Sequence, residues 1–346
     1  MPPPRILVIR RRYLGDIVLL GPVFRNLRLH WPNARLAAVV EPAYAPVLML
    51  NPDVDETFVL PRRLVDWPAF LARLRRAGFT HVFDLDNNDR TALLTRMTGA
   101  PLRTALWHER SRARWRLAYT ADVYHPPEIH EHCSIVDYYL AALQSASVPI
   151  ATREVRLVPR AQDIATVERL LGGPRAAQPG RPRRILVHPG SRSAFRMWPA
   201  ENFARVCDLA QDELGAQVFV VAGPSEQTMV AEIRRHAKTH LVALNSTLSI
   251  PQFAALAAQF DLMLCHDSGP MHVAAAVGTP VVALLGSQNP VLFAPSGTGH
   301  TVLQPPLPCR TCVAPLRCMP GDSYHNYCVR NLTVDRVWEA VRKKLV

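Results

Sequence analysis

Short apolar runs alternate with amphipathic segments along the first half of the chain. The apolar runs occupy 6–9, 36–40, 57–60 and 81–86. Segments with helical spacing follow them over 17–30, up to 50, over 67–77 and over 91–97. Runs of Val, Ile, Leu and Ala are typical of strands covered on both faces, and this alternation is that of a parallel α/β sheet. The pattern predicts one such sheet in the first half.

The alternation restarts after a polar stretch, GGPRAAQPGRPRR, which is typical of an interdomain linker. Apolar runs then recur within ILVHPG, QVFVVAG, LVAL, DLMLCHDS and PVVALLG. We therefore predict an α/β fold with two doubly wound domains, whose strand ends form a ligand-binding cleft. The expected parts are an N-terminal domain over 1–170, a linker over 171–184 and a C-terminal domain over 185–330.

The last segment has the spacing of an amphipathic helix. Its apolar side chains fall on one helical face, namely Val337, Trp338, Val341 and Leu345. We expect a helix within 331–346 that packs back on the body of the protein.

Turns that follow strands are the candidate sites, because open α/β sheets bind ligands at the carboxyl ends of their strands. In CHDSGPMHV, Asp267 ends an apolar run, Ser268 and Gly269 form a turn, and Pro270 begins a helix. Amides at a helix start suit a phosphate, and His272 could add a hydrogen bond. The alternative is a plain strand-to-helix connection with Asp267 as cap and His272 in the core.

A second turn of this kind, HPGSRSAFRMWP, carries Gly190, Ser191, Arg192 and Arg196. Two phosphate-binding turns at one sheet edge favour a single nucleotide site, where Arg196 would neutralise a leaving diphosphate; otherwise Arg196 is simply solvated. Glu226, after a third strand, would accept hydrogen bonds from ribose hydroxyls or complement the next helix start.

Acidic residues follow two strands of the first half. Asp16, in IRRRYLGDIVLLGP, is either a helix cap or a catalytic carboxylate. In FDLDNNDR, the residues Asp84, Asp86 and Asp89 could hold a divalent ion. Their spacing favours structure instead, because Asp84 and Asp86 alternate along a strand and Asp89 is placed to cap the next helix.

The chain is strongly basic, with a net charge of +12 and a pI of about 9.9, which favours anionic partners. No basic run is interleaved with aromatic residues, so we expect no nucleic-acid binding. Two groups of arginines suit an anionic acceptor or lipid headgroups, or a solvated surface: Arg10, Arg11 and Arg12, and Arg110, Arg112, Arg114 and Arg116.

Seven cysteines, an odd number, favour a reducing compartment. Four of them have the spacing C-x2-C-x5-C-x9-C, which suits either a metal site or reduced thiols packed in a loop: Cys309, Cys312, Cys318 and Cys328. No segment resembles a signal peptide or a membrane-spanning helix. The absence of G-x-G-x-x-G, of a P-loop and of G-x-S-x-G disfavours nicotinamide oxidoreductases, P-loop kinases and α/β-hydrolases.

Four motifs, in order, resemble the bacterial heptosyltransferases of glycosyltransferase family nine, which build the inner core of lipopolysaccharide. They are RILVIRRRYLGDIVLLGPVFRNLR, ILVHPGSRSAFRMWPAENF, VVAGPSEQ and DLMLCHDSGPMHVAAAVGTPVVALLG. The resemblance implies a GT-B fold, in which two Rossmann-like domains face each other across a cleft. It also implies an inverting, metal-independent transfer, usually from ADP-L-glycero-β-D-manno-heptose, with the acceptor bound mainly by the first domain and the donor by the second.

The resemblance also assigns residues. The family's catalytic aspartate, in its L-G-D motif, corresponds to Asp16, and the lysine before its W-P pair is replaced here by Arg196. Its diphosphate loop, D-[ST]-G-x-x-H, corresponds to the segment from Asp267 to His272. The cysteine cluster looks like that of a subset of the family and need not imply a metal. Positions before L-G-D that are often small or hydroxylated are arginine and tyrosine here.

We therefore expect a cytoplasmic glycosyltransferase, with or without peripheral contact to the inner face of the inner membrane. It would move heptose from ADP-heptose to an anionic lipid-linked saccharide of the lipid A-Kdo type. The alternatives are a family member that uses another sugar or a protein acceptor, a GT-B-like nucleotide-sugar epimerase, and a non-catalytic nucleotide-sugar-binding protein.

Overall fold

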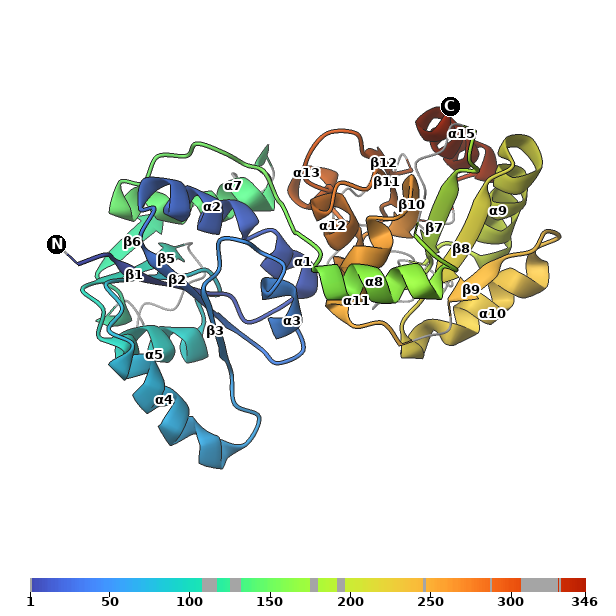
Figure 1. The fold of residues 1–346 in the computed structure, drawn as a ribbon. Helices are drawn as coiled ribbons and strands as arrows, with labels where there is room; N and C mark the ends of the chain where they lie inside the picture. Colours follow the sequence, from blue (N-terminus) through green and yellow to red (C-terminus); the bar gives the residue numbers. More distant parts are fainter. Residues whose placement is uncertain are drawn as a thin grey trace, which may run out of the picture. The chain divides into compact units, whose positions relative to one another are not determined.

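The computed structural model describes residues 2–107, 117–124, 132–174, 180–191, 197–244, 247–286, 288–305, 329 and 331–346. The chain divides into two compact units, Met1–Val158 and Pro159–Val346, whose helices and strands are labelled in Figure 1. The division falls after Val158, whereas composition placed the linker at 171–184. Helix α8 (Ala161–Leu170) belongs to the second unit, where it packs on α11 (Ile250–Ala257).

Unit 1 contains a six-stranded sheet whose strand pairs are all parallel among the described residues. The strands are β1 (Arg5–Ile9), β2 (Arg35–Val40), β3 (Glu56–Val59), β4 (His81–Asp84), β5 (Leu102–Trp107) and β6 (Ala121–Tyr124). Their order is β3-β2-β1-β4-β5-β6, so the order reverses between β1 and β4. In such sheets the ligand site lies outside the carboxyl ends of the strands at this reversal.

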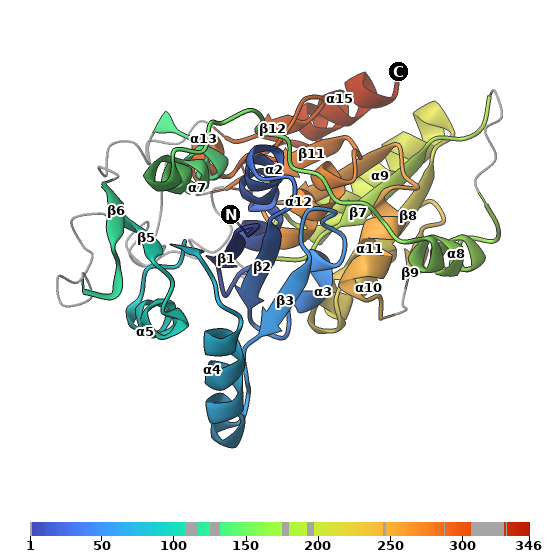
Figure 2. The ribbon, with the colours of Figure 1, turned by 60° about the vertical axis from the view of Figure 1, so that its left-hand side comes forward.

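Helices cover both faces of this sheet. In Figures 1 and 2, α2 (Gly21–His30) and α7 (Ile135–Ala141) lie on one side, and α4 (Trp67–Arg76) and α5 (Asp89–Thr98) lie on the other. Phe70 and Leu74 of α4 and Leu94 of α5 join the core beneath the strands. Short turns of helix complete the unit: α1 (Leu14–Val18), α3 (Ala45–Leu48), η1 (Leu64–Asp66) and η3 (Ala142–Ala146).

Two local predictions for unit 1 are wrong. The expected helix over 17–30 is two helices, because Pro22 has no N–H to donate and its ring obstructs a continuous helix, so α1 ends at Val18 and α2 begins at Gly21. Asp89 does not cap α5; the cap is Asn88, whose side chain accepts hydrogen bonds from the amides of Arg90 and Thr91.

Unit 2 repeats the same topology. Its strands are β7 (Arg184–His188), β8 (Gln217–Val221), β9 (Val242–Leu244), β10 (Leu262–His266), β11 (Val281–Leu284) and β12 (Thr301–Leu303). They pair in parallel in the order β12-β11-β10-β7-β8-β9, so the reversal lies between β7 and β10. The two sheets of strands interleaved with helices confirm the predicted doubly wound α/β class.

Two apolar clusters cover the faces of the second sheet. One lies under α9 (Ala200–Leu214), α10 (Gln227–His236) and α15 (Val334–Leu345), and the other lies under α8, α11 and α12 (Gly269–Ala276). The terminal helix buries the four residues of its apolar face, Val337, Trp338, Val341 and Leu345. The short helices η5 (Pro224–Glu226) and α13 (Pro290–Phe293) complete the unit.

Candidate active site

Asp16 lies just after β1, at the strand-order reversal of unit 1. It is the third residue of α1, and its Oδ2 accepts a hydrogen bond from the amide of Tyr13 at 3.1 Å, as in a capping box. Its Oδ1 accepts two further hydrogen bonds, from the guanidinium of Arg10 at 2.6 Å and from the hydroxyl of Tyr139 at 2.7 Å. The carboxylate therefore caps a helix and is also held from two other elements.

Arg10 connects this carboxylate to the end of β4. Besides Asp16, it donates to the backbone oxygen of Leu85 at 2.9 Å and lies 3.2 Å from Asp86. Asp86 accepts hydrogen bonds from the backbone amide and Nε of Arg11 at 3.0 and 2.9 Å. Two of the arginines before L-G-D are thus structural partners of acidic residues.

Asp84 anchors the loop that carries Asp86. It is fully buried, and its Oδ1 accepts hydrogen bonds from the amides of Asp86 and Asn87. Its Oδ2 accepts one from the hydroxyl of Tyr119 at 2.8 Å. Burial raises the pKa of Asp84 to about 6, although these hydrogen bonds oppose the shift. Asp84 and Asp86 thus organise this strand end.

The charges around Arg10 balance one another. Burial alone would lower the pKa of Arg10, but interactions with Tyr139 and with the carboxylates of Asp16 and Asp86 outweigh it and raise that pKa. Burial raises the pKa of Tyr139 well above its ordinary value, so its hydroxyl stays protonated and can donate. The Arg10 guanidinium also lies 5.4 Å from the centre of the Tyr139 ring.

A cavity of about 280 Å³ opens at the carboxyl ends of β1 to β3. Three arginines line it, Arg11, Arg62 and Arg90, together with Glu41 and the apolar side chains of Leu60 and Trp67. A cavity with this lining suits an anionic group next to an apolar one.

In unit 2, Ser268 and Gly269 follow β10 at the second strand-order reversal. Ser268 is the N-terminal cap residue of α12, but its hydroxyl makes no cap hydrogen bond. This Oγ is buried and has no hydrogen-bond partner among the described residues. Pro270 occupies the first turn of α12, and His272 is buried one turn further on. The serine hydroxyl and the helix start can therefore serve a ligand.

Gly190 and Glu226 meet beside the end of β7. A Cβ atom at Gly190 would overlap the Glu226 carboxylate, so a larger residue there would displace that carboxylate. Glu226 accepts a hydrogen bond from the amide of Gly223 at 2.9 Å and lies 3.8 Å from Nε2 of His188. Burial lowers the pKa of His188, although Glu226 opposes the shift. The structure thus brings together two of the predicted donor-binding residues.

Trp198 precedes α9 and is held by two hydrogen bonds. Its backbone amide donates to Nε2 of His266 at 2.7 Å, and its Nε1 donates to the oxygen of Leu332 at 2.9 Å. Burial lowers the pKa of His266 to about 3, so the imidazole is neutral and can accept this hydrogen bond. Ser191 lies at the edge of the described turn. Arg192 and Arg196 lie outside the described residues.

Several other predicted groups also lie outside the part of the chain that the structure describes. They are Arg110, Arg112, Arg114 and Arg116, and the cysteines Cys309, Cys312, Cys318 and Cys328. Within the described ranges, no three His, Cys, Asp or Glu side chains gather as they would around a metal ion. Among the helices described, none has the length and apolar composition needed to cross a membrane.

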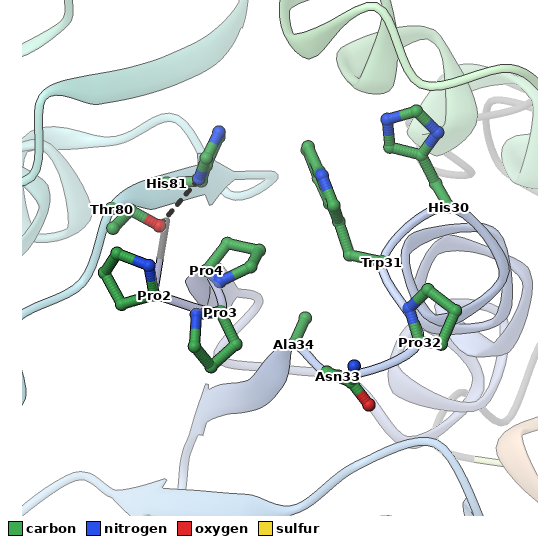
Figure 3. A pocket seen from close by; sticks show the side chains of 10 residues that line it. All are labelled: Pro2, Pro3, Pro4, His30, Trp31, Pro32, Asn33, Ala34, Thr80 and His81. Carbon is green, nitrogen blue, oxygen red and sulfur yellow. Dashed lines mark hydrogen bonds between the residues drawn. The ribbon is translucent and has the colours of Figure 1, made fainter.

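A larger cavity, of about 840 Å³, lies at the opposite end of the first sheet. Figure 3 shows its lining, in which Pro4, Ala34 and Thr80 precede or begin β1, β2 and β4. His81 and Trp31 contribute rings whose centres lie 5.0 Å apart. Because the amino ends of parallel strands point away from Asp16, this cavity is separate from the candidate site.

Residues 67–319 match the family described as glycosyltransferase family 9 (heptosyltransferase). The chain belongs to this family. The predicted family is therefore confirmed, and the protein is a glycosyltransferase of the heptosyltransferase family.

Individual relatives are distant but cover most of the chain. Lipopolysaccharide heptosyltransferase 3 of Escherichia coli K12 is 26% identical over 82% of this chain and 83% of its own length. The structure of a family 9 glycosyltransferase from Veillonella parvula is 22% identical, with a TM-score of 0.83 over 100% of this chain and 98% of its own.

Structures of the Escherichia coli heptosyltransferase WaaC with ADP and with ADP-2-deoxy-2-fluoro heptose also share the fold of this chain. They are 16% and 17% identical to it, with TM-scores of 0.75 and 0.72, and each comparison covers 98% of this chain and 99% of WaaC. These likenesses confirm the GT-B fold of this family member.

Sequence reasoning missed three residues of the site. Tyr139 and Asp86 hold Asp16 and Arg10, and His266 accepts a hydrogen bond from the backbone amide of Trp198. Of these three residues, only Asp86 stands in a motif that the sequence singles out, the acidic cluster over 84–89. The spacing of that cluster favours a structural role and does not predict an ion pair with an arginine.

Proposed function

We propose that this protein transfers a heptose from ADP-L-glycero-β-D-manno-heptose to a hydroxyl of an anionic, lipid-linked saccharide of the lipopolysaccharide inner core. The transfer inverts the anomeric configuration and needs no metal ion. The observation that carries the proposal is the Asp16 carboxylate, held at the strand-order reversal of unit 1 with 18% of its side chain exposed.

Asp16 acts as the general base. A carboxylate at this position can take the proton of an acceptor hydroxyl while the hydroxyl oxygen attacks the anomeric carbon from the face opposite ADP. The bond to the ADP oxygen breaks at the same time, and the electron pair leaves with ADP. This chemistry requires that the acceptor hydroxyl meet both the base and the donor sugar, so each unit contributes one half of the reaction.

Unit 2 binds the donor. The buried Ser268 hydroxyl and the start of α12 bind the diphosphate, with Asp267, Gly269, Pro270 and His272 shaping the turn. We assign Gly190, Ser191 and Arg192 to the same donor site, where Glu226 accepts from the ribose and Arg196 stabilises the charge that develops on departing ADP. The complexes of WaaC with ADP and an ADP-heptose analogue support this nucleotide.

Unit 1 binds the acceptor. The cavity at the carboxyl ends of β1 to β3 is lined by Arg62 and Arg90, whose positive charge suits the carboxylates or phosphates of an anionic saccharide. The names of the curated relatives, which are heptosyltransferases of lipopolysaccharide or lipooligosaccharide, support this acceptor class. We place the protein in the cytoplasm, where nucleotide sugars are made, with peripheral contact to the inner membrane.

The donor and the stereochemistry can be tested on the purified protein. Thermal shift with ADP, UDP, GDP and CMP should show stabilisation by ADP above the other three. Transfer from ADP-heptose to a deacylated lipid A-Kdo saccharide should give a product of inverted anomeric configuration by NMR. Equal shifts with all four nucleotides would contradict the ADP-heptose donor, and a retained configuration would contradict direct displacement.

A further inference from the structure

The two oxygens of the Asp16 carboxylate have unequal surroundings. Oδ1 accepts from Arg10 at 2.6 Å and from Tyr139 at 2.7 Å, whereas the one donor to Oδ2 among the described residues is the amide of Tyr13, at 3.1 Å. Each carboxylate oxygen offers about two lone pairs. Oδ1 is therefore fully used, and Oδ2 keeps one lone pair.

We propose that Tyr139, Arg10 and Asp86 are positioning residues, which hold the Asp16 carboxylate so that Oδ2 is the proton acceptor, and that the pH dependence of transfer changes when they are substituted. The inference rests on the proposed role of Asp16 as general base. The proton of the acceptor hydroxyl passes to Oδ2 as the new glycosidic bond forms and ADP leaves with the electron pair of the broken bond.

The three positioning residues act on the carboxylate in opposite directions. Tyr139 and Arg10 stabilise the ionised form of Asp16, since each donates a hydrogen bond to it and Arg10 adds a positive charge. Asp86 works against Arg10, because it lies 3.2 Å from the same guanidinium and offsets that charge. Asp86 is itself fixed by two hydrogen bonds from Arg11.

The rigidity of this arrangement comes from burial. The Tyr139 side chain is fully buried, and the side chain of Asp86 is only 7% exposed. Other titratable side chains lie on the elements packed around α1, and none of them is substituted in the variants below: Arg11, Arg12, Tyr13, Glu41, Tyr44, Asp84 and Tyr138.

The test is the pH profile of kcat/KM for heptosyl transfer in two variants. Tyr139→Phe removes one donor from the carboxylate and keeps the ring, so the acidic limb should move to higher pH by about 1 pH unit. Asp86→Asn removes the second carboxylate beside Arg10, so the positive charge of Arg10 acts mainly on Asp16 and the acidic limb should move to lower pH. A purely structural role would lower the rate and leave the limb in place.

Tyr119→Phe is the matched control. It also removes a phenol-to-carboxylate hydrogen bond, of 2.8 Å, from a tyrosine of unit 1, but the carboxylate is Asp84. Its acidic limb should stay at the wild-type position. If Asp86→Asn does not fold, Arg10→Gln replaces it; this variant removes the charge itself and should move the limb to higher pH, as Tyr139→Phe does.

The outcomes separate this inference from the proposed function. If Asp16→Asn abolishes transfer but the limbs of Tyr139→Phe and Asp86→Asn coincide with that of the wild type, the positioning inference is overturned and the base assignment stands. Limbs that move in the same direction for both variants also overturn it. If Asp16→Asn keeps near-wild-type transfer, the base assignment itself is wrong.

Discussion

Asp84 should make the free energy of unfolding of this protein depend on pH between about pH 4 and pH 6. The test is Asp84→Asn, which keeps the shape and an acceptor oxygen but cannot ionise. In the folded protein, burial raises the pKa of Asp84 from 3.8 to about 6. The difference corresponds to about 3 kcal/mol.

The sign follows from proton binding. Between about pH 4 and pH 6 the native state keeps the Asp84 proton while the unfolded chain releases it, so the free energy of unfolding falls as the pH rises. The free energy of unfolding of Asp84→Asn should not fall in this way, because asparagine does not ionise. The unfolding free energy of the wild type minus that of the variant should therefore decrease by up to about 3 kcal/mol between pH 4 and pH 7.

Urea denaturation of both proteins at half-unit pH intervals measures this difference directly. Asp66→Asn, at an exposed position of the same unit, controls for the general effect of removing one carboxylate. A wild-type minus variant difference that stays constant from pH 4 to pH 7 would refute the argument that burial dominates at Asp84.

Three further predictions concern the donor site and the metal requirement. Ser268→Ala should weaken ADP binding about tenfold by calorimetry, because the buried hydroxyl would no longer donate to the diphosphate; unchanged affinity would exclude that contact. Gly190→Ala should raise the KM for ADP-heptose, because the added methyl group displaces the Glu226 carboxylate. Adding Glu226→Ala to this variant should raise the KM only slightly further. Additive increases in KM would show that the two residues act independently. Transfer should continue at full rate after EDTA treatment and gel filtration, and recovery of a lost rate by added Mg²⁺ would contradict metal-independent transfer.

The strands that the sequence predicts are those with uninterrupted apolar runs. β1 and β10 are buried along nearly their whole length, so most of their residues are apolar. β5 and β6 escaped prediction because Arg103 and Thr104 interrupt the first and because half of the second is exposed at the sheet edge. Strand ends could be located, and with them Asp16, Gly190 and Ser268, because these residues belong to short local motifs.

The partners of those residues could not be predicted in the same way. Tyr139 is separated from Asp16 by 123 positions, and Asp86 from Arg11 by 75. No periodicity or spacing in a single sequence relates residues so far apart; the strand order β2-β1-β4 brings Asp86 to Arg10, and the packing of α7 brings in Tyr139. The sequence thus indicates candidate site residues, while tertiary packing determines which side chains hold them.

The central claim is that the Asp16 carboxylate takes the proton of the acceptor. Single-turnover transfer from saturating ADP-heptose by Asp16→Asn measures this step most directly, because asparagine keeps the size of the side chain but is not a base. We expect Asp16→Asn to transfer heptose at a rate at least about 100-fold below that of the wild type, with unchanged ADP affinity and an intact thermal transition. Transfer at a rate near that of the wild type by the folded variant would contradict it.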